Sequence, residues 1–451
     1  MRHTIFSLFI TLITSVGTVF ASNTVVNNIW YDFDDITQTA IVTYKGETYY
    51  SYGQEYSGAI TIPTTVTYIH KTYNVVGINE YAFYGCSNLT SVVISEGITS
   101  IGLYAFRGCT RLNSVTLPST IQHISMGVFS ETGIQSNTNN WENGVLYVGN
   151  SLISAHSNDV TGDYTIKANT TCIADGALYG CTELTSITIP NSVAYIGDEA
   201  FAWCEGITSI NIPSSVLTIG AQPFFCCWSL TAINVDVNNA NYCSVDGILF
   251  SKDTTTLIEC PQDFGVLEYT IPASVSEIEE YAFYRCKIAT ISAESVITIK
   301  KQAFAECKVL TTINMGNSVT NIGRAAFISC DSLTNIVIPS SVISIEDNAF
   351  YYCRSLSSIS NFAAEPQVIT NSVFDGVNKT NCILYVLPES IDLYSDADVW
   401  KDFGTILPIS SDPTAISPVY CETNSTKLLH NGQILILRGE KMYTMTGQEV
   451  R

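Results

Sequence analysis

The chain has 451 residues, of which 46 % are hydrophobic and 14 % are charged. Its 41 acidic and 20 basic residues give a formal net charge of -21, and such a charge repels nucleic acid and anionic membrane surfaces. The length exceeds what one hydrophobic core commonly serves, so we expect internal repeats or several domains.

Residues 1–21 have the pattern of a secretory signal peptide. Arg2 supplies a positive charge, residues 5–20 form an apolar run, and Val19 and Ala21 are small residues at the two positions that guide cleavage. The run is too short for a transmembrane helix, which needs about 20 apolar residues, and no later stretch is long enough. The sequence therefore predicts export to the extracellular space or the outer cell surface, without a transmembrane segment.

Residues 22–75 are expected to form an N-terminal β cap. They are rich in Tyr and Thr, and apolar residues alternate in stretches such as residues 40–44, which is typical of a half-buried strand. A repeat array needs such a cap, because an exposed last turn would pair with another chain.

From residue 76 to residue 408 the sequence repeats itself. An Ala-Phe pair or a degenerate copy recurs, and its aromatic position advances by 23 residues, for example from Phe304 to Phe327 to Phe350. Roughly eleven coils follow from this count. No single coil can bury so much apolar surface alone, so the pattern predicts a solenoid in which stacked coils share one core.

Residues 181–204 indicate how one coil is built. Leu184, Ile187 and Ile189 form the apolar side of a half-buried strand. Pro190 ends the strand, because proline has no N–H to donate to a ladder. Residues 198–204 are expected to form a helical or 3₁₀ turn that directs Phe201 inward. The predicted fold class is a mainly-β solenoid of short strands and helical or 3₁₀ turns.

Stacking places many of the cysteines in one column, three residues after the aromatic position: Cys86, Cys109, Cys181, Cys204, Cys227, Cys286, Cys307, Cys330 and Cys353. A buried column of small apolar side chains accounts for them. Residues in register lie about 4.8 Å apart, which is more than the roughly 3.8 Å between the Cβ atoms of a disulfide. The spacing therefore favours free thiols over disulfides. A linear row of thiols also does not form a tetrahedral metal site.

A second column carries hydroxyl groups at the turn that follows each strand: Thr65, Thr120, Ser192, Ser215, Ser274, Ser318 and Ser341. Hydroxyl side chains at turns bond to nearby backbone groups. Because buried polar groups must be satisfied, we expect this column to form such bonds.

The repeated pattern C-x-x-L-x-x-[VI]-x-I-P-x-S-V-x-x-I-G-x-x-A-F resembles the BspA-like class of leucine-rich repeats. The resemblance covers about residues 76–377 and implies a leucine-rich-repeat solenoid. Members of this class with export signals are bacterial surface or secreted proteins. Several of them are associated with adhesion to host matrix proteins or to other microbes.

Two insertions, at about residues 132–168 and 236–268, interrupt the period. They share a motif, at residues 143–147 and 246–250, in which Asn-Gly or Asp-Gly precedes apolar residues. This motif predicts β-hairpins that project from a coil or extend it. The insertions are similar to the hairpin insertions of BspA-like proteins.

Residues 382–408 are expected to close the solenoid with a strand at residues 382–386, followed by Tyr394, Trp400 and Phe403 over the end of the core. Residues 409–423 are predicted to be a linker. Residues 424–451 have a strand, an Asn-Gly turn and a second strand. This tail resembles the end of the sorting domains used by the type IX secretion machinery. The alternative is a small β-hairpin that packs on the solenoid.

The sequence shows no pattern expected of an enzyme or a metalloprotein. Its histidines are far apart and have no metal-binding spacing, and there is no P-loop, nucleophile elbow or dinucleotide fingerprint. We therefore predict no catalytic residues, no cofactor and no metal.

The exposed face of the strands is the candidate ligand-binding surface: Ser114, Thr116, Ser186, Thr188, Ser209, Asn211, Thr312 and Asn314. Solenoids commonly bind ligands through such extended faces. The alternative is that Ser and Thr are simply acceptable residues on an exposed strand. The hairpins at about residues 141–153 and 242–258 are a second candidate, because irregular insertions often carry specificity.

Three functions remain open on these grounds. The first is an adhesin or protein-interaction scaffold that binds protein or glycan ligands on host or microbial surfaces. The second is a secreted glycan-binding module for nutrient capture, and the third is a structural component of the cell envelope.

Overall fold

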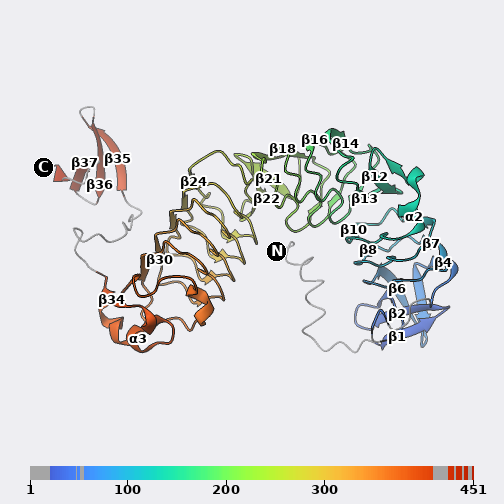
Figure 1. The fold of residues 1–451 in the computed structure, drawn as a ribbon, viewed down its shortest axis with the longest axis horizontal. Helices are drawn as coiled ribbons and strands as arrows, with labels where there is room; N and C mark the ends of the chain where they lie inside the picture. The colour runs from blue at the N-terminus through green and yellow to red at the C-terminus, as the bar shows by residue number, and fades with distance from the viewer. Residues whose placement is uncertain are drawn as a thin grey trace.

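The structure is a computed structural model that describes residues 21–46, 48–50, 55–409, 425–430, 433–438, 441–444 and 449–450. It is a mainly-β solenoid of about 14 turns with few helices, and the solenoid bends into an arc (Figure 1). The predicted fold class is therefore confirmed. Residues 1–20 of the predicted signal peptide and residues 410–423 of the predicted linker lie outside the described residues.

Successive coils are joined by two ladders of short strands that are largely parallel. The first, which we call the short-strand ladder, has three segments: β1 (Ala21–Val26), β2 (Ile29–Asp34), β3 (Thr39–Thr43), β6 (Lys71–Ile78), β8 (Ser100–Ile101) and β10 (His123–Ile124), with β5 (Thr65–Tyr68) paired to β6; β11 (Trp141–Glu142), β12 (Val145–Val148), β13 (Ser151–Ala155), β15 (Cys172–Ile173), β17 (Tyr195–Ile196) and β19 (Thr218–Ile219); and β21 (Tyr242–Val245), β22 (Ile248–Ser251), β23 (Thr256–Glu259), β25 (Glu277–Ile278), β27 (Thr298–Ile299), β29 (Asn321–Ile322) and β31 (Ser344–Ile345).

The second, the long-strand ladder, has five segments: β4 (Gly58–Ile62), β7 (Leu89–Ile94) and β9 (Ser114–Thr116); β14 (Gly162–Thr165) and β16 (Leu184–Thr188); β18 (Ser209–Ile212) and β20 (Ala232–Val235); β24 (Glu268–Thr270), β26 (Thr290–Ser292) and β28 (Thr312–Asn314); and β30 (Asn335–Ile338), β32 (Ser358–Asn361), β33 (Ile383–Val386) and β34 (Thr405–Pro408). Figure 1 labels β8, β10 and β13 toward the inner side of the arc and β14, β16 and β18 along its outer side.

Each segment of the short-strand ladder begins with the same antiparallel meander, which is β1–β2–β3, β11–β12–β13 or β21–β22–β23. The first turn of each meander has two consecutive residues with positive φ: Asn27 and Asn28, Asn143 and Gly144, or Asp246 and Gly247, as type I′ turns require. The third strand then pairs in parallel with the following coil. The hairpins predicted in both insertions are thus confirmed. They extend the ladder, and the N-terminal segment has the same plan.

In most coils the core contains an aromatic ring that stacks on the ring of an adjacent coil. The centroids of Phe304 and Phe327 are 5.1 Å apart with an interplanar angle of 2°, and those of Phe327 and Phe350 are 5.4 Å apart, also at 2°. At the C-terminal end, Trp400 and Phe403 each lie 5.5 Å from the last ring of the stack, Phe374. The predicted covering of the core end by these aromatic residues is confirmed.

The few helical segments are short and lie beside the first insertion or at the C-terminal end of the solenoid: α2 (Gly133–Ser136), η2 (Thr138–Asn140), η3 (Asn371–Phe374), η4 (Pro388–Ser390), α3 (Ile391–Asp396) and η5 (Trp400–Asp402). Thr132 caps α2, because its side chain accepts a hydrogen bond from the Gln135 N–H. No described helix is long and apolar enough to cross a membrane.

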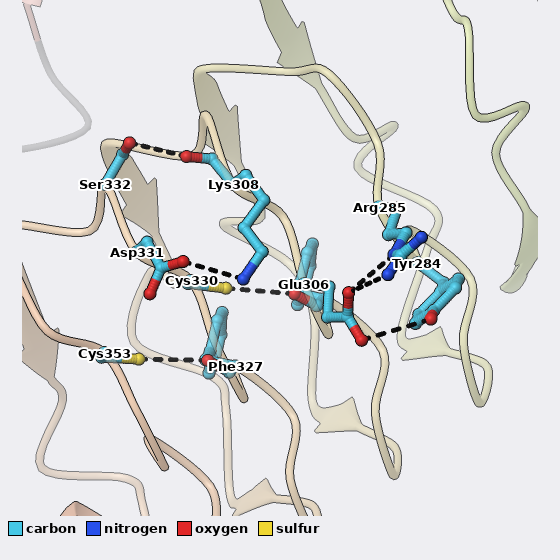
Figure 2. A network of polar contacts seen from close by, with 10 residues as sticks. Tyr284, Arg285, Glu306, Lys308, Phe327, Cys330, Asp331, Ser332 and Cys353 are labelled. Carbon is cyan, nitrogen blue, oxygen red and sulfur yellow. Dashed lines mark hydrogen bonds and ion pairs between the residues drawn. The ribbon is translucent and has the colours of Figure 1, made fainter. Parts of the chain in front are cut away.

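The cysteine column is buried and its thiols are free, as the spacing predicts. The thiols also have a polar role that the sequence does not reveal. Most of them donate the S–H to a carbonyl group one coil earlier, at 3.1 Å from Cys330 to Phe304 and at 3.0 Å from Cys353 to Phe327 (Figure 2). Of the adjacent pair, Cys227 occupies the column and donates to Phe201 at 3.2 Å.

The hydroxyl column is confirmed at four positions, where the side chain donates to a carbonyl of the preceding coil at 2.7 to 2.8 Å: Thr120 to Ile98, Ser192 to Thr170, Ser215 to Val193 and Ser341 to Val319. The prediction is wrong for Thr65, which lies in β5 and is exposed. The reason is that β5 forms a hairpin with β6 and does not follow the coil pattern.

The helical or 3₁₀ turn expected at residues 198–204 is a series of hydrogen-bonded turns. The N–H of Ala202 bonds to Glu199 and that of Cys204 to Phe201, at 3.0 and 3.2 Å. Glu199 and Trp203 have φ values of 51° and 61°, and residues in this left-handed region interrupt a helix. The turn instead donates N–H groups to the carbonyls of the next coil, as from Phe201 to Pro223 at 2.9 Å.

The described part of the tail is a separate antiparallel sheet: β35 (Ser425–His430), β36 (Gln433–Arg438), β37 (Lys441–Thr444) and β38 (Glu449–Val450). β35 and β36 pair from Ser425 with Arg438 to His430 with Gln433. This pairing agrees with the two predicted strands. The Asn-Gly pair between them lies outside the described residues, and the sorting role stays a proposal.

Candidate functional site

The eight residues predicted as a ligand-binding face are all exposed and lie on the long-strand ladder: Ser114 and Thr116 on β9, Ser186 and Thr188 on β16, Ser209 and Asn211 on β18, and Thr312 and Asn314 on β28. They do not share one sheet, because β9, β16, β18 and β28 belong to four different segments of that ladder. The face is therefore a broken row of polar patches.

Several of these side chains already bond to neighbours on an adjacent coil. Ser186 donates to Asp163 at 2.6 Å, Asn211 accepts from Asn234 at 3.1 Å, and Asn314 donates to Glu294 at 3.3 Å. The hydroxyl and amide groups thus partly satisfy one another along the ladder. A ligand on this face would have to compete for these groups.

A second surface runs along the turns, from two residues before the buried aromatic residue of each coil to five residues after it. We call it the turn edge. In most coils the residues two before and two after the aromatic residue have positive φ: Tyr81, Tyr104, Glu199, Gln222, Tyr281, Gln302, Ala325 and Asn348 before it, and Glu131, Trp203, Cys226, Arg285, Glu306, Ser329 and Tyr352 after it. A side chain there costs roughly 1–2 kcal/mol relative to glycine.

Glycine occupies the same turn positions in other coils, as Gly85, Gly108 and Gly180 do. The fold therefore accepts glycine at these places and does not require the larger residues. Large side chains such as Trp203 and Arg285 stand there at a cost in backbone strain. Strain of this kind, kept where a simpler residue would serve, is a feature of functional surfaces.

One aromatic group on the turn edge spans the second insertion. Phe225 stacks on Tyr284 with centroids 4.8 Å apart and meets Tyr281 at 5.7 Å. Trp203 lies edge-on to Trp228 at 6.0 Å. All five rings are half-buried. We call these five rings, together with Arg285, the junction cluster.

Arg285 holds the junction cluster together. Its guanidinium lies 5.1 Å from the ring of Trp228 and 5.5 Å from that of Tyr284, as in cation–π contacts. It also pairs with Glu306 of the next coil at 2.5 Å, and the Tyr284 hydroxyl donates to the same carboxylate at 3.4 Å (Figure 2). Lys308 and Asp331 continue this row of ion pairs at 2.8 Å.

A similar group lies near the N-terminal end of the solenoid. Tyr49 stacks on Tyr81 with centroids 3.9 Å apart, and Tyr81 lies 5.8 Å from Tyr104. Arg107 covers the ring of Tyr104 at 5.0 Å and pairs with Glu131 at 2.8 Å. The turn edge thus carries two groups of aromatic rings, each with an arginine that has an acidic partner.

Several of the buried thiols are poor candidates for chemistry. Burial raises the pKa of Cys172 and of Cys382 to about 12, and burial also raises the pKa of Cys330 and Cys353 well above the ordinary value. A thiol that stays protonated is neither a nucleophile nor a metal ligand. This agrees with the structural role that the sequence predicts for the column.

One set of side chains in the described residues has the geometry of a metal site: His123, Asp175 and Asp198, whose ligand atoms lie within 4.8 Å of one another. Both carboxylate oxygens of Asp175 are 3.0 Å from Nε2 of His123. Burial lowers the pKa of His123, but the hydrogen bond and charge of Asp175, together with the charge of Asp198, outweigh it and raise the pKa.

Sequence reasoning missed both the turn-edge aromatic groups and this set. The histidines share no column with one another, so their spacing alone gives no sign of a metal site. Asp175 and Asp198 are 23 residues apart and do share a column. His123 precedes Asp175 by 52 residues because the first insertion lies between them. A search for acidic residues at the coil period would have found the pair.

Residues 76–161, 153–264 and 260–381 match a family described as the BspA type leucine rich repeat region. A leucine rich cell surface protein from Faecalibacterium prausnitzii A2-165 is 23 % identical over 86 % of this chain and 95 % of that chain, with a TM-score of 0.47. The pneumococcal vaccine antigen PcpA is 20 % identical over 87 % and 99 %, with a TM-score of 0.48. A leucine-rich repeat protein from Bacteroides ovatus ATCC 8483 is 23 % identical over 86 % and 100 %, with a TM-score of 0.38. A comparison with curated proteins finds no match.

Proposed function

This chain belongs to the BspA-type leucine-rich repeat family, and on that premise we propose that it is an exported, non-catalytic scaffold that adheres to proteins on host or microbial surfaces. The junction cluster carries this proposal. It presents five half-buried aromatic rings and an arginine on one stretch of the turn edge.

Tyr, Trp and Arg are the residue types that dominate the binding energy of protein interfaces, whereas Ser and Thr contribute little. A rigid aromatic ring offers a large contact area at a low cost in conformational entropy. In the junction cluster, the rings are already held by one another and by Arg285. A partner would therefore pay little to order them.

The strand face predicted from the sequence is proposed as a secondary contact. Ser209, Asn211, Thr312 and Asn314 are exposed and polar, so they would add hydrogen bonds around a partner held at the turn edge. Replacing these four by alanine should weaken binding less than one substitution in the junction cluster. A larger loss from the strand face would assign the primary site to it instead.

The function is tested by capture of labelled surface proteins from intact host and microbial cells on the purified chain. Trp228→Ala should reduce capture by 10-fold or more, because truncating a central aromatic anchor costs about 2 kcal/mol or more. Tyr179→Ala is the matched control: this ring is 46 % exposed and occupies the turn edge of another coil, outside both aromatic groups. Equal capture by all three proteins would reject the junction cluster as the binding site.

A secreted glycan-binding module is the second candidate, since exposed aromatic rings also stack on sugars and the strand face carries many hydroxyl groups. A glycan array separates the two. Binding to defined glycans that Trp228→Ala removes, without capture of surface proteins, would favour the second function over the first.

Export and surface attachment rest on residues 1–21 and on the tail. Protease treatment of intact cells should release fragments of a surface protein, and full protection would contradict surface display. Deleting residues 424–451 should lower the amount at the surface if the tail sorts the protein. An unchanged amount would leave the tail as a packing element.

A further inference from the structure

We propose that His123, Asp175 and Asp198 form a binding site for one divalent transition-metal ion, with Zn²⁺ as the best match. The three side chains come from three successive turns at the first insertion. His123 lies on β10, Asp175 follows β15 and Asp198 follows β17. Their ligand atoms all lie within 4.8 Å of one another.

The backbone fixes the positions from which these side chains reach the site. The N–H of Asp175 donates to the carbonyl of Ile124 at 2.9 Å, which joins the coil before the first insertion to the coil after it. β15 and β17 then pair in parallel, with Cys172 opposite Tyr195 and Ile173 opposite Ile196. His123 therefore lies on a strand and each aspartate lies two residues after one, and rigid elements position ligands more precisely than loops.

Both carboxylates are oriented in advance by backbone groups of the next coil. The N–H of Asp198 donates to Oδ1 of Asp175 at 2.8 Å, and the N–H of Ala221 donates to Oδ1 of Asp198 at 2.7 Å. A second oxygen of each carboxylate remains for another partner, and in Asp175 it lies 3.0 Å from His123. Hydrogen bonds of this kind to the ligands are the usual support around a metal site.

The local charge favours a cation. Asp175 and Asp198 lie beside His123, and Glu199 follows Asp198 in the chain. These carboxylates share a small region with a single histidine, so negative charge is only partly offset there. A divalent ion would neutralise it more completely than His123 does.

The donor set and the spacing point to zinc among divalent ions. Imidazole suits Zn²⁺ and its neighbours in the transition series, whereas Ca²⁺ and Mg²⁺ prefer sites built from oxygen alone. For bonds of about 2.0–2.1 Å, tetrahedral ligand atoms lie roughly 3.3 Å apart. The 3.0 Å between Nε2 of His123 and Asp175 is close to this, so these two side chains would need only a small outward shift to hold an ion. The ligand atom of Asp198 lies within 4.8 Å of both.

A fourth position remains available to water or to a group from a partner. Asp175 also lines a cavity of about 170 Å³ beside the first insertion, together with Ser130, Gln135 and Ser154. With three protein ligands, the fourth coordination position of the ion would be open. An ion or water could reach this position through the cavity that Asp175 lines. Occupation would also link the coil of His123 to the coils of Asp175 and Asp198 across the insertion.

Titration calorimetry with ZnCl₂ tests the proposal on the purified, untagged chain after treatment with chelator and exchange into buffer. We expect one equivalent to bind with a dissociation constant in the micromolar range or below, and the melting temperature to rise with bound metal. His123→Ala and Asp198→Asn should each weaken binding by 10-fold or more. His156→Ala is the matched control, because His156 pairs with Asp159 at 3.3 Å on an exposed surface outside the metal-like set.

The absence of a stoichiometric Zn²⁺ site would overturn the proposal, as would full affinity in His123→Ala. Equal loss in His156→Ala would overturn it too, because the effect would then not belong to this site. CaCl₂ as a second titrant should give no comparable binding, and tighter binding of Ca²⁺ than Zn²⁺ would contradict the chosen class of ion. If His123→Ala does not fold, Asp198→Asn decides alone, since Asp198 is exposed and circular dichroism reports its fold.

Discussion

Glu259 lies where the solenoid core divides. One hydrophobic cluster extends from Ile29 to Leu249 and a second extends from Ile248 to Phe403, so that neighbouring residues of β22 face different clusters. Glu259, the last residue of β23, is 6 % exposed at this junction. Burial raises the pKa of its carboxyl group to about 8, and the N–H of Phe224 from the preceding coil opposes this rise only in part.

In the parent chain, the buried Glu259 makes the folded protein less stable as the pH rises. We expect Glu259→Gln to remove this loss of stability. Below the ordinary pKa of 4.5, the carboxyl group is protonated in both the folded and the unfolded chain and has no effect. From there to about pH 8 the unfolded chain ionises first, so the folded protein becomes less stable as the pH rises. At ~1.4 kcal/mol per pH unit, the interval gives an upper limit of about 5 kcal/mol.

Urea unfolding followed by tryptophan fluorescence measures this effect at pH 5, 7 and 9. The free energy of unfolding of the variant should exceed that of the parent chain increasingly from pH 5 to pH 9. Glu183→Gln is the control, because Glu183 is exposed and its removal should leave the pH profile parallel to that of the parent. If Glu259→Gln also runs parallel to the parent chain, the reasoning about the buried carboxyl group is refuted.

Three further predictions concern the columns of the core. Phe327→Ala should lower the free energy of unfolding by about 3–5 kcal/mol in urea denaturation, because the ring is fully buried between two stacked neighbours. Ser341→Ala should cost about 1 kcal/mol in the same assay, since it leaves the carbonyl of Val319 without its donor at 2.7 Å, and no change would argue against the hydroxyl column. Cys330 should resist iodoacetamide in the native protein and react after denaturation, because burial raises the pKa of its thiol well above the ordinary value. Mass spectrometry of the labelled protein measures this. Rapid labelling of Cys330 in the native chain would contradict the prediction.

The 23-residue period of the sequence predicts the stack of aromatic rings in the core. A 23-residue step places one aromatic residue above another, and Phe304, Phe327 and Phe350 stack at 5.1 and 5.4 Å accordingly. The Asn-Gly and Asp-Gly pairs likewise predict the hairpins in both insertions, since their residues accept positive φ. Both predictions depend on residues that are close in sequence or separated by one repeat period.

The N-terminal meander was predicted only as a β cap. It turns at Asn27 and Asn28, which both have positive φ, but without glycine the pair is a weaker signal for a type I′ turn. Its equivalence to the two insertions appears only when β3 and β6 are seen to pair in parallel, as β13 and β15 do.

The junction cluster could not be predicted in full, because some of its contacts join coils across the second insertion. Phe225 and Tyr284 are 59 residues apart in a sequence whose period is 23, yet their rings are 4.8 Å apart. The positive φ of Trp203 and Arg285 is also unexpected, because tryptophan and arginine give no signal for this conformation. The first insertion likewise separates His123 from Asp175 by 52 residues in the sequence. The 23-residue period therefore does not indicate that the two side chains lie close together.

Substitution by glycine tests most directly whether the strained positions of the turn edge serve binding. Trp203→Gly and Arg285→Gly relieve positive φ in the junction cluster, and Ser329→Gly does the same at the equivalent place of a coil outside it, where φ is 57°. Our account predicts that all three variants keep or gain stability against urea, and that only the first two lose adhesion of the labelled protein to intact cells. Unchanged adhesion of Trp203→Gly and Arg285→Gly would contradict it.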